Sequence, residues 1–242
     1  MGTYWHFEYI DADGIDEIRK AVRQNIFYGA SLIKLIADTS SSYSSLEEIR
    51  EAVKVAHKAG LAVAVHVVVD EPTKNAILGG VDSIEHGFYL SDSVLLLMKE
   101  KGTVLVGTDF PLKHLLEGGQ DTPENAKTLA NTIAGRLRRA HKIGVKMGFG
   151  TDIVVDLPNE NRAEMRWDYL EVWRTADVPA AEILKCMITN NAELLRIDRE
   201  RGAIRPGFAA DIVAAPANPL EDIEALRRVY FVMKNGKIVR RP

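Results

Sequence analysis

Cysteine is nearly absent from this sequence. Cys186 is the single cysteine among 242 residues, which excludes an internal disulfide and a cluster of thiolates that could hold a metal ion. It lies in the helical stretch AAEILKCMITNNAELL. We therefore expect a small buried apolar side chain at this position rather than a catalytic nucleophile.

Long apolar runs and a marked charge imbalance are also missing. The longest run, 61–69, contains a histidine and is far shorter than the roughly 20 residues that span a bilayer. The formal net charge is −3, with basic residues dispersed along the chain, so we expect neither nucleic-acid nor membrane binding. No cationic segment followed by an apolar one opens the sequence, which favours a cytoplasmic location.

What is present is a regular alternation of strand-like and helix-like segments. Five apolar runs, at about 31–37, 61–68, 81–85, 103–107 and 145–150, each follow a helical pattern that ends in glycine. Those helical patterns cover about 13–28, 46–59, 72–78, 92–101 and 123–143, and more helices are expected at 163–174 and 179–195. This alternation predicts right-handed βα units around a parallel sheet, an α/β fold.

The pattern changes near residue 199. A turn-rich segment is followed by short strand-like runs at 210–215, 229–234 and 237–240, with Asn235-Gly236 as a hairpin turn between the last two. We therefore predict an α/β domain over 1–198 and a small β appendage over 199–242.

Residues that can bind metal ions occur at the ends of four of the strand-like runs. They are Lys34, His66, His86 and Asp152. A parallel barrel gathers the carboxyl ends of its strands at one mouth, so these distant residues can become neighbours. Imidazoles and a carboxylate suit a hard or borderline metal ion. The simpler alternatives are a strand lysine that reaches to solvent and a core histidine bonded to a carbonyl.

Sequence stretches along most of the chain resemble the metal-dependent amidohydrolases, in the branch of imidazolonepropionase-like enzymes and Xaa-Pro dipeptidases. The matching stretches include GASLIKLIAD, LEEIREAVKVAHKAGLAVAVH, AILGGVDSIEHGFYL, AHKIGVKMGFGTD and ITNNAELL. The resemblance implies an incomplete (β/α)8 TIM-type barrel, of about the last five βα units. It also implies a hydrolase that cleaves C–N bonds of small amides, dipeptides or cyclic amides with a metal-activated water.

The resemblance also implies roles for single residues. Lys34 would be a carboxylated lysine that bridges two divalent ions, usually zinc, and His66 and His86 would bind the second ion. Asp152 would bind the first ion and accept a proton from the activated water.

Loops that follow strands commonly contact substrate in such barrels. On that ground Tyr43, His114, Asn161 and Arg162 are candidates for substrate binding, with a helix N-cap as the alternative for Asn161. Glu85 alternates away from His86 along its strand, and we expect it to face a helix.

One family feature has no counterpart here. The His-x-His motif of the first barrel strand is absent, and His6 stands alone near the start. The sequence thus resembles an N-terminally truncated family member. The alternative to an active hydrolase is a catalytically impaired fragment, or a subunit that needs a partner to complete the barrel.

An open parallel sheet leaves strand edges unpaired, and such edges promote association. We therefore expect the isolated chain to form homo-oligomers through the open barrel edge. Size-exclusion chromatography with light scattering checks this expectation, and a clean monomer across a concentration series would contradict it.

Overall fold

The computed structural model describes residues 9–38, 43–118, 122–154, 156–157 and 159–241. It contains two compact units. The first comprises residues up to 107 together with 142–146, and the second comprises 108–141 together with 147–242. His6 lies outside the described residues.

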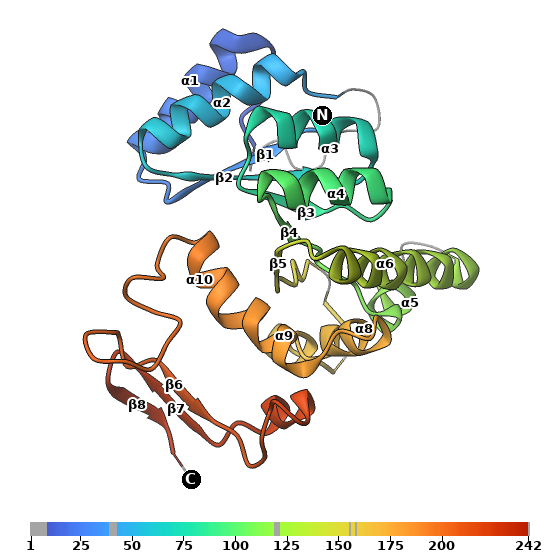
Figure 1. The fold of residues 1–242 in the computed structure, drawn as a ribbon, viewed down its shortest axis with the longest axis vertical. Coiled ribbons are helices and arrows are strands. Elements are labelled where there is room, and N and C mark those ends of the chain that lie inside the picture. The colour runs from blue at the N-terminus through green and yellow to red at the C-terminus, as the bar shows by residue number, and fades with distance from the viewer. Residues whose placement is uncertain (1–8, 39–42, 119–121, 155, 158, 242) are drawn as a thin grey trace. The chain divides into compact units, whose positions relative to one another are not determined.

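The first unit is built from alternating helices and parallel strands (Figure 1). Its elements are α1 (Gly14–Phe27), β1 (Leu32–Ile36), α2 (Leu46–Lys58), β2 (Ala62–Val67), α3 (Asp70–Gly79), β3 (Ser83–His86), α4 (Asp92–Lys101) and β4 (Val104–Val106). The parallel strand order in this unit follows the chain, β1-β2-β3-β4. These elements confirm the predicted α/β alternation.

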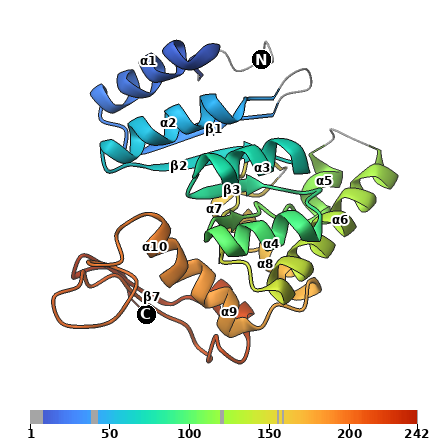
Figure 2. The same ribbon diagram turned by 45° about the horizontal axis from the view of Figure 1, so that its top comes forward.

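The helices of this unit cover one face of the sheet (Figure 2). Val63, Val65 and Ile84 lie on that face and are 0% exposed. They alternate with residues of the opposite face, as the period of a β-strand requires. Burial of such β-branched side chains stabilises the unit by roughly 1.5–3 kcal/mol each before entropy is counted.

Local hydrogen bonds explain why α2 begins where it does. Ser45 Oγ accepts a hydrogen bond from the Glu48 N–H, and Glu48 Oε2 accepts one from the Ser45 N–H at 2.7 Å. This capping box satisfies donors that the first helical turn leaves without partners. The other Glu48 oxygen accepts a hydrogen bond from the Gly14 N–H, which joins the start of α1 to α2.

The fifth predicted strand is also present, as β5 (Met147–Gly148). The backbone carbonyl of Lys146, the residue before β5, accepts a hydrogen bond from the Leu105 N–H of β4 at 2.9 Å. Five strands therefore occur in the predicted positions.

The second unit contains β5, several helices and an antiparallel sheet (Figure 1). Its elements are α5 (Leu112–Glu117), most of α6 (Pro123–Ile143), α7 (Arg162–Met165), α8 (Tyr169–Thr175), α9 (Ala180–Lys185), the π-helix η1 (Cys186–Asn190), α10 (Asn191–Leu194), β6 (Ile212–Ala214), the 3₁₀-helix η2 (Ile223–Arg228), β7 (Phe231–Lys234) and β8 (Lys237–Arg240).

The strands expected after residue 199 form the antiparallel sheet β6-β7-β8. Asn235 and Gly236 have φ values of 49° and 76°, as the predicted hairpin turn requires. The domain boundary between 198 and 199 stays a prediction. The sequence did not predict α5 or η2, and the expected helix at 163–174 is two helices separated by Arg166–Asp168.

None of the helices in the described part of the chain is long and apolar enough to cross a membrane.

A buried ion pair joins the loop after β4 to α6 within the second unit. Arg136 Nη2 donates a hydrogen bond to Asp109 Oδ1 at 2.7 Å, and the two side chains are 0% and 1% exposed. Burial raises the pKa of Asp109 above its ordinary value, and Arg136 opposes that rise. A buried pair of this kind is costly to break, because the remaining charge has no water around it.

Asp109→Ala should therefore lower the free energy of unfolding by about 3–5 kcal/mol. The double variant Asp109→Leu with Arg136→Met removes both charges and should lose clearly less than the single variant. Urea denaturation of the three proteins measures the difference, and equal losses in the single and double variants would contradict this account.

Candidate functional site

The carboxyl ends of β1 and β2 are joined by hydrogen bonds. The Ala37 N–H donates to the His66 carbonyl at 3.1 Å, and the Val68 N–H donates to Asp38 Oδ2 at 2.6 Å. The other Asp38 oxygen, Oδ1, lies 3.5 Å from His66 Nε2. Asp38 is thus a buried carboxylate, 7% exposed, that is placed to orient the His66 ring.

His66 and His86 come together although 20 positions separate them in the sequence. Their ring centroids lie 4.4 Å apart, edge to face. His86 ends β3 and has a φ of 71°, in the left-handed region that few residues other than glycine adopt. The next loop is fixed to β2, because the Gly87 and Tyr89 N–H groups donate to the Val67 and Val68 carbonyls at 2.8 and 2.9 Å.

Lys34 lies on the same sheet face as His66. In the β1–β2 register Lys34 is opposite Ala64 and Ile36 is opposite His66, and alternate residues of a strand share a face. Lys34 is exposed and lines a pocket of about 430 Å³ formed by α1, β1 and α2. The structure therefore places Lys34 and His66 on one face, at neighbouring strands.

Glu85 corrects one expectation from the sequence. It is opposite His66 in the β2–β3 register, and so shares the face of Lys34 and His66 rather than the helix-covered face of Ile84. Its carboxylate accepts a hydrogen bond from Ser83 Oγ at 2.6 Å. The expectation failed because it used His86 as the reference, and the backbone turns at His86.

Asp152 belongs to the second unit. It lies four residues after the end of β5, is exposed, and has a φ of 46°. Left-handed backbone at a residue other than glycine costs of order 1–3 kcal/mol and occurs often at functional sites.

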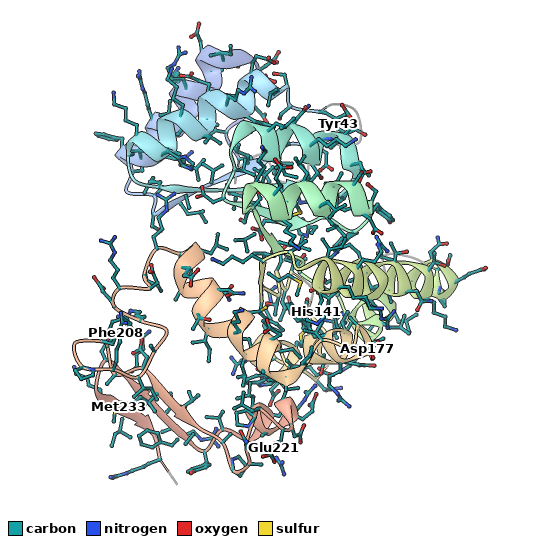
Figure 3. All side chains as sticks on the ribbon, in the orientation of Figure 1. Tyr43, His141, Asp177, Phe208, Glu221 and Met233 are labelled. Atoms are coloured by element: carbon teal, nitrogen blue, oxygen red, sulfur yellow. The ribbon has the colours of Figure 1, made fainter. Side chains whose placement is uncertain are left out.

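Three of the four residues predicted to bind substrate lie in loops or at the start of a helix. Tyr43 is 55% exposed on the loop after β1 (Figure 3) and forms a β-bridge with Asp38. Asn161 caps α7 by accepting a hydrogen bond from the Glu164 N–H at 3.0 Å, as in the alternative interpretation. Arg162 makes two hydrogen bonds to Asp156, at 2.9 and 3.2 Å. Their roles in substrate binding stay predictions.

His114, the fourth substrate candidate, is buried in a polar cluster of the second unit. Its Nε2 lies 3.2 Å from Asp168 Oδ2, and its ring centroid lies 5.4 Å from that of Tyr169. Partial burial raises the pKa of Asp168, but hydrogen bonds and charges from His114, Lys113 and Arg227 outweigh burial and hold that pKa below its ordinary value. Asp168 is therefore an anion at neutral pH.

The same cluster contains polar atoms with unused hydrogen-bonding capacity. His114 Nδ1 and the Tyr169 hydroxyl are buried and have no hydrogen-bond partner among the residues that the structure describes. Burial raises the pKa of Tyr169, and the charges of Asp152, Asp109 and Asp168 raise it further. Tyr169 therefore stays a neutral phenol. Buried groups of this kind can bind a water molecule or a polar ligand atom.

Cys186 is 1% exposed, and burial raises the pKa of its thiol to about 12. It therefore stays protonated at neutral pH, which confirms the expected buried side chain and excludes a resting thiolate nucleophile.

Comparison with known proteins gives the family. The model of the amidohydrolase family matches residues 3–239. The chain belongs to the amidohydrolase family.

Similar proteins are known in sequence and in structure. The chain is 31% identical over 250 residues to ochratoxinase of Aspergillus niger, covering 96% of this chain and 51% of that protein. A Xaa-Pro dipeptidase crystallised with methionine in its active site is 31% identical, with a TM-score of 0.85 over 95% of this chain and 59% of the other. A prolidase complexed with N-methylphosphonate-L-proline is 29% identical, with a TM-score of 0.79 and coverage of 96% and 60%.

This amidohydrolase chain spans about half the length of the curated relatives that it matches. Amidohydrolases generally use divalent metal ions. The question is then whether side chains of the first unit could bind such an ion. His66 and His86 offer two neighbouring imidazoles, which suit zinc. Within the described residues no group of three or more His, Cys, Asp or Glu side chains is placed to hold a metal ion. The two imidazoles could therefore supply a part of the coordination shell of a zinc ion.

The sequence analysis of this amidohydrolase missed Asp38. A carboxylate near a ring nitrogen of a metal-binding histidine fixes the tautomer and ring orientation, and losing it typically lowers metal affinity 10- to 100-fold. The available signal was its place at the end of SLIKLIAD, four residues after Lys34. The residue was not singled out because a carboxylate at the end of a strand is common.

Asp38→Ala should lower the free energy of unfolding by about 1–3 kcal/mol, because the Val68 N–H loses its acceptor. If His66 binds zinc, the affinity for zinc should also fall, because the His66 ring loses the carboxylate beside it. Denaturant titration and competition with a zinc indicator measure the two effects. Asp16→Ala is the control, because Asp16 is 93% exposed and should change stability by less than about 0.5 kcal/mol. Equal results for the two variants would show that Asp38 has no such role.

Proposed function

We propose that this chain is part of a metal-dependent hydrolase that cleaves C–N bonds in small amides, with dipeptides of the Xaa-Pro type as the first substrate class to test. The observation that carries the proposal is the approach of His66 and His86, at 4.4 Å between ring centroids, in a chain of the amidohydrolase family. Relatives named prolidase and Xaa-Pro dipeptidase support the substrate class.

The five βα strands support a place for these residues in a TIM-type barrel. Barrel enzymes keep their active sites at the carboxyl ends of the strands, and β1, β2 and β3 present Lys34, Asp38, His66 and His86 at or near those ends.

The proposal assigns a role to each of the candidate residues. His66 and His86 would hold a divalent ion, zinc by donor chemistry, and Lys34 would contribute as a carboxylated side chain. When bound, such an ion acidifies water and polarises a carbonyl. Asp38 would keep the His66 ring in place.

Asp152 would carry the proton in this scheme. Its carboxylate would take a proton from the attacking water as the carbonyl carbon gains the new C–O bond. It would then deliver that proton to the nitrogen as the C–N bond breaks, so the amine leaves neutral. The exposure of Asp152 supports a residue that exchanges protons with substrate rather than one buried in the core.

The small number of protein ligands for a metal ion favours a second candidate function. Catalytic zinc sites commonly use three protein ligands, and no such triple occurs in the described part of this chain. In this second scheme the chain is a subunit that needs a partner to complete the barrel, or a catalytically impaired fragment. Under either scheme we expect at most one tightly held ion per chain.

Elemental analysis after zinc loading and dialysis tests the metal assignment. The double variant His66→Ala with His86→Ala should lose the bound ion, while the wild type retains it. A matched control, His57→Ala with His141→Ala, removes two imidazoles from α2 and α6 and should retain the ion. Equal metal content in all three proteins would refute the assignment.

Hydrolysis of Xaa-Pro dipeptides and N-acyl amino acids tests the activity. The incomplete shell predicts a slow, metal-dependent release of amine by this chain, lost in Asp152→Asn and in the double histidine variant. A rate that survives metal removal would contradict the proposal. A metal-loaded chain with no hydrolysis at all would select the second candidate.

A further inference from the structure

The carboxyl end of β5 is held by an unusual turn of helix. The π-helix η1 (Cys186–Asn190) follows α9, and α10 begins at the next residue, Asn191. Asn190 Nδ2 donates a hydrogen bond to the Met147 carbonyl at 2.7 Å, and Asn191 Nδ2 donates one to the Phe149 carbonyl at 2.9 Å. The Phe149 N–H in turn donates to the Cys186 carbonyl at 3.3 Å.

Two of these bonds tie consecutive helical side chains to one strand end, and the third ties the helix backbone to it. Carbonyls two residues apart on a strand point the same way and are separated by roughly 6.5 Å. Consecutive residues of a regular α-helix point about 100° apart, so they do not normally meet one strand together. A widened π turn is the local irregularity at this point, and such turns occur often at functional sites.

Asn190, Asn191 and the Cys186 carbonyl form a clamp on Met147 and Phe149. The clamped residues come just before Asp152 in the sequence. Only Gly150 and Thr151 separate Phe149 from Asp152, and Asp152 has a φ of 46°. Backbone in this region persists only where its surroundings hold it. A clamp at Phe149 therefore restricts where the Asp152 carboxylate can lie.

We propose that Asn190 and Asn191 are positioning residues for Asp152. Their amides fix the end of β5, and the fixed strand end sets the place of the carboxylate. This inference rests on the role given to Asp152 under the proposed function. The two asparagines do not touch the reacting atoms in this scheme.

A simple packing role is the competing explanation, because Asn190 is buried, at 6% exposure. Leucine has nearly the shape of asparagine and cannot donate a hydrogen bond. Asn190→Leu and Asn191→Leu therefore separate the two explanations, since a packing role tolerates leucine better than a clamp does. Asn25→Leu is the matched control, because Asn25 Nδ2 also donates to a backbone carbonyl, that of Ala21, at 3.1 Å.

Hydrogen exchange of the full chain is the first readout, and it does not depend on activity. In Asn191→Leu the Phe149 amide should exchange about tenfold faster than in the wild type, and faster still in the double variant. Amides of β2 should keep their wild-type rates, as should all amides of β5 in Asn25→Leu. Unchanged exchange at Phe149 in the double variant would overturn the clamp. A uniform increase over both strands would overturn it too, because it would mean general destabilisation.

Kinetics of the metal-loaded chain is the second readout. Asn191→Leu should lower kcat at least tenfold and change KM by less than about twofold, since only the placement of the proton acceptor changes. Asn25→Leu should leave kcat and KM at their wild-type values, because Asn25 donates to a carbonyl within its own helix. An unchanged kcat in Asn191→Leu, or an equal loss of kcat in Asn25→Leu, would overturn the positioning role. If the wild type hydrolyses nothing while Phe149 exchange responds as expected, the proposed function fails and the clamp stands.

Discussion

The parallel arrangement of the strands is the constraint on which the rest of this structure depends. Helices cover one face of β1–β4, so Val63, Val65 and Ile84 are removed from water. The opposite face is thereby left to other side chains, and in register they include Lys34, Ala64, His66 and Glu85. Because parallel strands all point the same way, residues of different strands meet at their carboxyl ends. His66 and His86 are the clearest instance.

Hydrogen bonds from side chains outside the strands fix the carboxyl ends of β1, β2 and β5. Asp38 accepts from the Val68 N–H and so joins the ends of β1 and β2. In the second unit, Asn190 and Asn191 hold the carbonyls of Met147 and Phe149. The left-handed backbone of His86 and Asp152 requires such support, because each conformation costs free energy that the surroundings must offset.

Much of the fold could be predicted from the sequence because hydrophobic period and glycine positions are local signals. The five strand-like runs and the Asn235-Gly236 turn follow from neighbouring residues alone. The proximity of His66 and His86 could be inferred as well, since it needs only parallel strands. The sequence-based prediction put Glu85 on the wrong face of the sheet. It assumed regular alternation of faces along the strand, and the backbone departs from that alternation at His86.

Other features depend on contacts between distant segments, and the sequence gives no local signal for them. The Asp109–Arg136 ion pair joins residues 27 positions apart, and the clamp on β5 spans more than 40 positions. The π turn at Cys186–Asn190 lies inside a segment that reads as continuous helix. Asp38 is similar, because its carboxylate contacts the Val68 N–H and the His66 ring at the end of the next strand.

X-ray absorption spectroscopy of the zinc-loaded chain tests the central claim most directly. If the ends of β2 and β3 bring His66 and His86 to one ion, the spectrum will show imidazole scattering from two histidines per zinc at about 2.0–2.1 Å. That scattering will fall to background in the variant lacking both imidazoles. A spectrum of bound zinc without histidine scattering, or with the same histidine scattering in that variant, would contradict the account.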